Sequence, residues 1–99
     1  MITRIVKMTF MSEKVSQFKE IFNQSKNLIQ AFDGCISVEL MKDVNRDNRY
    51  FTLSYWRTED DLTNYRQSYL FKNTWSKVKP LFSEPAEAWS LMNENADSI

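Results

Sequence analysis

The sequence predicts an α+β domain in which helices cover one face of a four-stranded antiparallel sheet. Two observations support this prediction. Apolar and polar residues alternate with period two in several short runs, and between these runs apolar residues recur at helical spacing. The chain also has 99 residues, of which 42% are hydrophobic, which suits one domain with a core of its own and hardly two.

The first strand is predicted at residues 2–10, which are rich in β-branched side chains and roughly alternate. The face of this strand that carries the larger apolar residues consists of Ile2, Arg4, Val6, Met8 and Phe10. Ser12 is the expected N-cap of a long amphipathic helix, with Glu13 in its first turn. Asp33 and Gly34 are expected to end the helical run.

Residues 35–42 and 49–56 predict two further strands, because both alternate and a polar cluster of turn formers separates them at 43–48. Thr58 then begins a capping-box pattern, with acidic Asp61 three residues later, and this predicts a short helix carrying Leu62 and Tyr65.

Ser68 is the expected N-cap of the next helix, in which Phe71, Trp75 and Val78 form one apolar stripe and which Pro80 ends. Residues 85–92 predict the last strand, with the proline at its start. We expect a single domain over 1–93 and a frayed tail over 94–99.

The resulting order, β-α-β-β-α-β, is the ferredoxin-like motif. Its helices cover one face of the sheet, while the other face also carries apolar residues. Packing two such sheets face to face in a homodimer would bury that second face.

Composition excludes several classes of site. The chain has no histidine and one cysteine, so it cannot form a Ser-His-Asp or Cys-His nucleophile, a histidine-ligated zinc or heme, or an intrachain disulfide. Its net charge is zero, so nothing steers it toward nucleic acid or an anionic membrane. With neither a leader nor an apolar run of about 20 residues, we expect a cytoplasmic protein without membrane contact, metal or cofactor.

Two motifs resemble the antibiotic biosynthesis monooxygenase family: Phe51-Thr-Leu-Ser-Tyr-Trp-Arg-Thr-Glu-Asp-Asp-Leu62 and Tyr65-Arg66-x-Ser68-x-x-Phe71-x-x-x-Trp75. The resemblance covers nearly the whole chain in element order. It implies a dimeric α+β barrel and, for one branch of the family, cofactor-free oxygenation of phenolic or quinol substrates. The heme-degrading branch is the poorer match. At the position of that branch's cavity Trp this chain has Tyr65, and at the position of its heme-ligating His it has Trp75. At the position of its catalytic Asn this chain has Val6.

The resemblance further implies a cavity between the sheet and the helix pair. The residues expected to line it and contact substrate are Val6, Trp56, Tyr65, Tyr69, Phe71 and Trp75. Tyr65 is the candidate proton-relaying residue, with Arg4 or Arg66 as groups that could lower the pKa of its hydroxyl. Arg4 is also the candidate anchor for a phenolate or quinolate oxygen. The alternatives are that the rings are core, that Arg4 forms a surface or interface ion pair, and that Arg66 faces solvent.

Two functions follow from these expectations. The first is a cofactor-independent monooxygenase acting on a small aromatic quinol, phenol or polyketide-like substrate. The second is a non-catalytic dimeric module of the same fold that binds a small ligand or acts as an interaction module.

Overall fold

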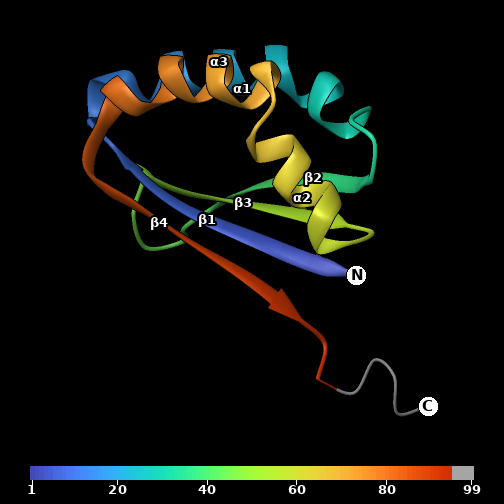
Figure 1. Ribbon diagram of the computed structural model, residues 1–99. Coiled ribbons are helices and arrows are strands. Elements are labelled where there is room, and N and C mark those ends of the chain that lie inside the picture. Colours follow the sequence, from blue (N-terminus) through green and yellow to red (C-terminus); the bar gives the residue numbers. More distant parts are fainter. Residues whose placement is uncertain (95–99) are drawn as a thin grey trace.

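A computed structural model describes residues 1–94 and confirms the predicted ferredoxin-like α+β fold. The four antiparallel strands lie in the order β2-β3-β1-β4 (Figure 1). The elements are β1 (Ile2–Phe10), α1 (Val15–Gln30), β2 (Cys35–Lys42), β3 (Arg49–Trp56), α2 (Glu59–Arg66), α3 (Tyr69–Val78) and β4 (Phe82–Met92). Two short 3-10 turns, Ser12–Lys14 and Lys79–Leu81, flank α1 and β4. The tail expected at 94–99 lies, apart from its first residue, outside the described residues.

The two predicted helix caps in the second half of the chain are confirmed. The Thr58 hydroxyl accepts the backbone N–H of Asp61 at 3.1 Å and begins α2. The Ser68 hydroxyl accepts the backbone N–H of Phe71 at 3.1 Å and begins α3. Only two residues separate α2 from α3, and these caps set where each of the two helices begins.

The N-cap predicted at Ser12 is wrong. Ser12 lies inside a 3-10 turn, its side chain caps nothing, and α1 begins at Val15. The physical reason is a tertiary contact: the Met11 N–H donates to the Leu81 carbonyl at 2.9 Å, and this holds the chain in a tight turn after β1. At its other end α1 stops at Gln30, and Gly34 makes the turn into β2 with a φ of 88°.

The last strand begins at Phe82, three residues before the predicted start at Pro85. The pairing of β4 with β1 shifts register between Lys7 and Thr9 and again between Thr9 and Phe10. Pro85 therefore lies within an irregular stretch of an edge strand, where the missing N–H breaks no regular ladder. A proline that was interpreted as a start signal instead marks a bulge.

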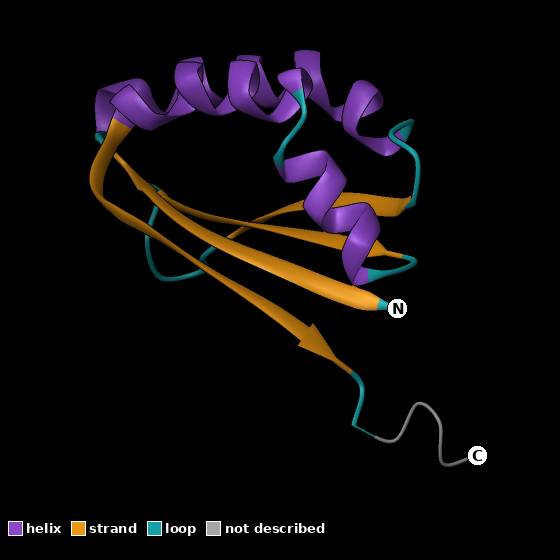
Figure 2. Cartoon of the chain, viewed as in Figure 1, coloured by secondary structure: helices purple, strands orange, loops and turns teal. Residues whose placement is uncertain are grey.

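The two faces of the sheet differ in what covers them. Figure 2 shows all helices on one face, and the core lies between them and the sheet. The other face carries a band of apolar side chains in register across three strands, with Ile5 opposite both Leu53 and Trp89, and Thr3 opposite Leu91. Trp89 is 43% and Leu91 49% exposed.

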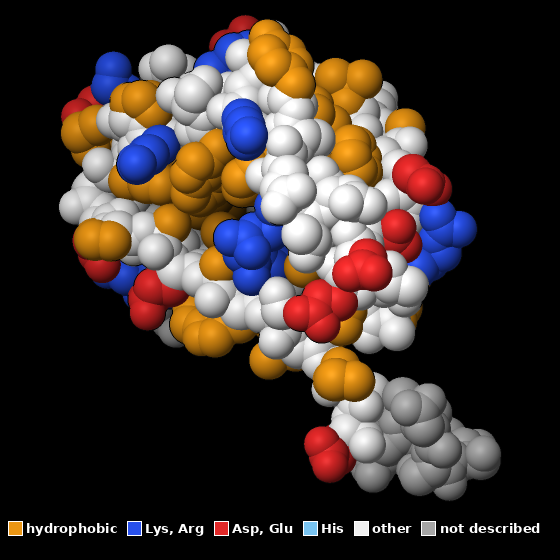
Figure 3. Space-filling model, viewed as in Figure 1, with side chains coloured by type: hydrophobic (Ala, Val, Ile, Leu, Met, Phe, Trp, Pro, Cys, Tyr) orange, Lys and Arg blue, Asp and Glu red, His pale blue; other side chains and the backbone are white. Residues whose placement is uncertain are grey.

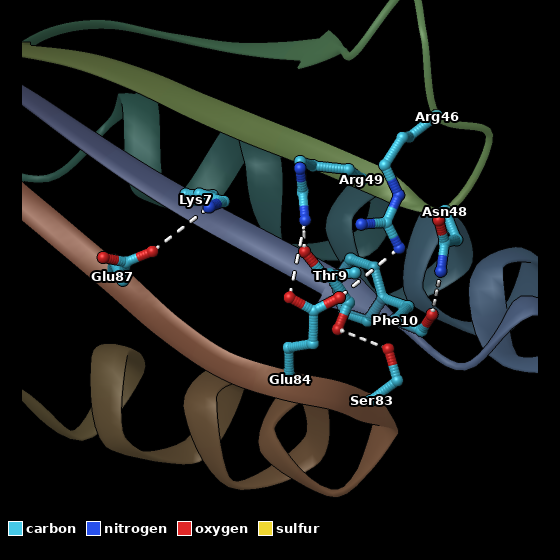
Figure 4. Close-up of polar contacts among 9 residues, drawn as sticks. All are labelled: Lys7, Thr9, Phe10, Arg46, Asn48, Arg49, Ser83, Glu84 and Glu87. Carbon is cyan, nitrogen blue, oxygen red and sulfur yellow. Dashed lines mark hydrogen bonds and ion pairs between the residues drawn. The ribbon is translucent and has the colours of Figure 1, made fainter.

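At one end, this uncovered face changes from apolar to charged. The carboxylate of Glu84 on β4 pairs with both Arg46 and Arg49 at 3.4 Å, and Arg49 also donates to the Thr9 hydroxyl at 3.0 Å (Figure 4). Lys7 pairs with Glu87 at 3.2 Å nearby. These contacts tie the irregular part of β4 to β1 and to the start of β3.

Candidate functional site

An apolar inner cavity of about 100 Å³ lies between the helices and the sheet. Residues from every helix and from β1, β2 and β3 line it, and nearly all of them are aliphatic or aromatic. The polar side chains in its wall are those of Thr52, Tyr65 and Thr74, together with the indole of Trp75. This position, between the sheet and the helices, is where the resemblance places a cavity.

A second, outer cavity of about 300 Å³ adjoins the inner one, since Val6, Tyr65, Phe71 and Trp75 line both. The remaining lining residues are Arg4, Leu62, Arg66, Ala86, Glu87 and Ala88. Figure 3 shows a hollow on this face, with Lys and Arg side chains at its edge and hydrophobic side chains beside it. The outer cavity thus joins an apolar interior to a basic rim.

Aromatic rings form the wall shared by the two cavities. The Tyr65 ring packs edge-on against Phe71 at 5.3 Å, and Phe71 stacks on Trp75 at 6.0 Å with the planes 9° apart. Tyr65 is near the end of α2 and the other two rings are on α3, so the caps at Thr58 and Ser68 set the spacing of this wall. The wall can pack against an aromatic ligand in the same edge-on and stacked arrangements.

The Tyr65 hydroxyl is free to meet a ligand. Within residues 1–94 it makes no hydrogen bond, and it is not among the fully enclosed polar atoms. Burial raises the pKa of Tyr65 well above its ordinary value of 10.0, and the nearby Cys35 thiol adds to the rise. The expectation that Arg4 or Arg66 lowers this pKa is therefore wrong, because burial dominates. At neutral pH the hydroxyl is a hydrogen-bond donor and not a base.

Arg4 reaches the outer cavity from β1, and its Nη1 donates to the Ser90 hydroxyl on β4 at 2.9 Å. Burial and then the positive charge of Arg66 lower the pKa of the Arg4 guanidinium from its ordinary 12.5. Arg4 forms no ion pair with any residue in the described part of the chain. The surface ion pair that was the alternative for Arg4 is thus absent from the described part of the chain.

A model of the antibiotic biosynthesis monooxygenase family matches residues 1–76, about three quarters of the chain. The chain belongs to the antibiotic biosynthesis monooxygenase family. Three solved structures have the same fold as this chain. Rv0793 from Mycobacterium tuberculosis has a TM-score of 0.87 at 18% identity, covering 97% of each chain. A conserved protein from Methanosarcina mazei has a TM-score of 0.88 at 19% identity, covering 94% of this chain and 93% of its own.

The third is SnoaB, a cofactor-independent oxygenase from Streptomyces nogalater. It has a TM-score of 0.81 at 15% identity, covering 94% of this chain and 92% of its own. The comparison with curated proteins gave no match.

In this family member, two residues expected in the cavity lie elsewhere. Tyr69 is 81% exposed and lines neither cavity, because it precedes Phe71 by two residues and so lies on the opposite side of α3. Trp56 is completely buried and lines neither cavity, because the Tyr65 ring stacks over it at 4.8 Å. The structure brings together Val6, Tyr65, Phe71, Trp75 and Arg4.

Sequence reasoning missed many of the lining residues, and two cases are instructive. The first is α1, which was predicted only as an amphipathic helix and which contributes Phe18, Ile21, Phe22 and Ile29 to the inner cavity. The second is Arg66, which was expected to face solvent. It is exposed, yet it lines the outer cavity. Its spacing was the available signal, since Leu62 precedes it by four residues and so shares its face of α2.

Other chemistry is sparse in the described residues. Burial raises the pKa of the Cys35 thiol, so this cysteine is not an activated nucleophile. No three His, Cys, Asp or Glu side chains converge within 1–94. None of the helices in that range has the length and apolarity needed to cross a membrane.

Proposed function

We propose that this protein is a cofactor-independent monooxygenase of a small aromatic quinol, phenol or polyketide-like compound. The observation that carries the proposal is the pair of adjoining cavities. They place an aromatic wall, the free Tyr65 hydroxyl and the guanidinium of Arg4 around one space. Family membership supports the reaction class, and SnoaB, of the same fold, is a cofactor-independent oxygenase.

The cavity volumes favour a substrate of one or two rings. Small-molecule sites usually measure about 300–1,000 Å³, and an apolar cavity of about 150 Å³ accepts benzene. The inner cavity, of about 100 Å³, suits the edge of one ring, and the outer cavity, of about 300 Å³, suits the rest of a small molecule. A compound of four fused rings would need the helices to move.

The chemistry that these residues support begins with an electron-rich ring in an apolar space. Arg4 favours the ionised form of a bound quinol or phenol, because an opposite charge nearby lowers the pKa of the ring hydroxyl. The electron-rich anion then reacts with O2: a ring carbon exchanges its hydrogen for one oxygen atom, the other oxygen atom leaves as water, and the ring, which supplies all four electrons, becomes a quinone. Tyr65, which stays protonated, donates a hydrogen bond to negative charge that develops on oxygen.

We also propose that two copies associate through the uncovered face of the sheet. The apolar band around Ile5, Leu53 and Trp89 would otherwise stay in water, which is unusual for a stable monomer. Face-to-face packing of two sheets buries such a band, and the charged end around Glu84 would remain at the rim.

The second candidate function is a non-catalytic dimeric module that binds a small ligand. One observation favours it: no side chain that lines the inner cavity is a base at neutral pH, since Tyr65 has a raised pKa. A module of this kind would bind aromatic ligands in the same cavities without consuming oxygen.

Oxygen uptake separates the two functions. Purified protein is mixed with one-ring and two-ring quinols and phenols, and with anthrones as larger polyketide-like compounds, without any added cofactor. Heat-denatured protein controls for autoxidation. The monooxygenase predicts enzyme-dependent uptake, with quinone products that carry one oxygen atom from labelled O2. Saturable binding of these compounds without uptake beyond the control would overturn the enzyme and leave the module.

A further inference from the structure

The five arginines of the chain differ in whether they form an ion pair with a carboxylate. Three form ion pairs with carboxylates, namely Arg46, Arg49 and Arg57. The other two, Arg4 and Arg66, form no ion pair within the described part of the chain. Both of them line the outer cavity. The cavity therefore collects the guanidinium groups that the described protomer leaves without a counter-charge.

The two groups reach the cavity from different elements. Arg4 comes from β1, is half-buried, and is oriented by its hydrogen bond to Ser90. Arg66 comes from the last turn of α2 and is exposed at the rim. The two positive charges are close enough that Arg66 lowers the pKa of Arg4. An anion placed between them would relieve this repulsion and form charge-assisted hydrogen bonds to both.

The one carboxylate among the residues lining this cavity does not neutralise them. It belongs to Glu87, which Lys7 holds at 3.2 Å. Lys7 itself does not line the outer cavity. The cavity thus keeps an excess of positive charge beside the apolar wall formed by Phe71 and Trp75.

We propose that Arg4 and Arg66 form a carboxylate-binding subsite, so that the ligand of this site is an aromatic carboxylic acid. The planar guanidinium fork matches a carboxylate with two parallel N–H donors. A carboxylate is ionised at neutral pH without a base, which suits a site whose tyrosine stays protonated. It also lies close to the plane of the ring that carries it, and that ring can then pack against the aromatic side chains of Phe71 and Trp75, which line the same cavity. A phosphate can pair with the same fork, but its tetrahedral oxygens do not lie in the plane of the ring.

That this acid is a substrate rests on the proposed function, whereas its binding does not. A ring hydroxyl on such an acid would then lie in the cavity that Tyr65 also lines, where the proposed reaction takes place. The inference thus narrows the substrate class from phenols in general to hydroxylated aromatic acids.

Binding of matched ligands tests the subsite. Hydroxynaphthoic acid, its uncharged primary amide and the corresponding naphthyl phosphate are titrated into the full chain at pH 7 by calorimetry. None of them requires turnover. We expect the acid to bind about ten to a hundred times more tightly than the amide, the range expected for charge-assisted hydrogen bonds. In Arg66→Gln and Arg4→Gln this ratio should fall to about threefold or less.

The matched control is Arg46→Gln, which removes an arginine that lines neither cavity, and its acid-to-amide ratio should equal that of the wild type. Because Arg66 is exposed, Arg66→Gln should fold normally even if Arg4→Gln does not. Equal affinity for acid and amide in the wild type would overturn the subsite. So would a preference that survives in Arg66→Gln, or tighter binding of the phosphate than of the acid.

Oxygen uptake then distinguishes failure of this inference from failure of the proposed function. Uptake with neutral quinols and no preference for acids would remove the subsite and leave the monooxygenase. If binding of the acid depends on the arginines but no quinol supports oxygen uptake, the subsite stands and the monooxygenase proposal fails.

Discussion

Tyr65 stacks on Trp56 with ring centroids 4.8 Å apart and planes at 27°, and Trp56 is completely buried. The indole N–H of Trp56 donates to the Ser54 hydroxyl at 2.9 Å, so the lower ring is fixed in the sheet. Trp56 was expected to contact the ligand. The structure makes it the support on which the cavity tyrosine rests.

The contact between Trp56 and Ser54 predicts a coupling that a double-mutant cycle can measure. Trp56→Phe should lower the free energy of unfolding by about 1–3 kcal/mol, because the smaller ring leaves a void in the core and the hydrogen-bond donor to Ser54 is lost. Ser54→Ala should cost less. In the double variant the two losses should not add, and the difference should be about 0.5–1.5 kcal/mol in urea unfolding. Strict additivity would mean that the hydrogen bond contributes nothing to stability.

Tyr65→Phe should separate chemistry from packing. The hydroxyl makes no hydrogen bond within residues 1–94, so its loss should change the free energy of unfolding by less than about 0.5 kcal/mol. Oxygen uptake should fall by about 10²–10³, as when one donor to a developing oxyanion is removed. Tyr69→Phe is the matched control, because Tyr69 is 81% exposed, and it should change neither quantity. A Tyr65→Phe enzyme with wild-type turnover would make Tyr65 a wall residue only.

The raised pKa of Tyr65 predicts a loss of stability in alkali. Between the unfolded pKa near 10.0 and the higher folded pKa, the unfolded chain has released this proton and the native chain has kept it. Stability is therefore fully present below pH 10 and falls above it, by at most about 1.4 kcal/mol per pH unit for this one group. The measurement is the urea midpoint of wild type minus that of Tyr65→Phe between pH 8 and 11.5. A difference that stays constant across this range would contradict the raised pKa.

Association through the uncovered sheet face predicts a dimer of about twice the 11.8 kDa chain mass. Leu53 lies opposite Ile5 in this band, so Leu53→Lys should shift sedimentation at micromolar concentration to the single-chain mass. Leu28→Lys places the same charge at a leucine that is 59% exposed on α1, and it should leave the dimer intact. A wild-type protein that sediments as one chain throughout would end the proposal.

Local signals were sufficient to predict most of the fold. The bounds predicted for β1, β2 and β3 are those observed, and the caps at Thr58 and Ser68 are in place, because alternation and capping are short-range effects. The errors occur where tertiary contacts determine the start of an element. The contact of Met11 with Leu81 sets the start of α1, and a bulge lets β4 begin before Pro85.

The site was less predictable, for a related reason. Helical spacing correctly placed Phe71 and Trp75 on one stripe. The same spacing argues against Tyr69, which was expected in the cavity because of the family resemblance. Which of two stacked rings meets the cavity depends on the approach of α2 to β3, so the order of Trp56 and Tyr65 could not be read from the sequence. Burial is equally non-local, and it decides the pKa of Tyr65.

The bulged stretch of β4 around Pro85 also limits what kind of assembly the chain can build. An open strand edge can recruit another edge without end, and that is how sheets grow into fibres. Around Pro85 the missing N–H and the register shifts make this stretch of the β4 edge a poor template for a further strand. Contact through the sheet face, in contrast, uses the same surface on both copies and is complete after two. The proposed dimer would therefore be a closed, finite complex, with no open-ended polymerisation through this stretch of the edge.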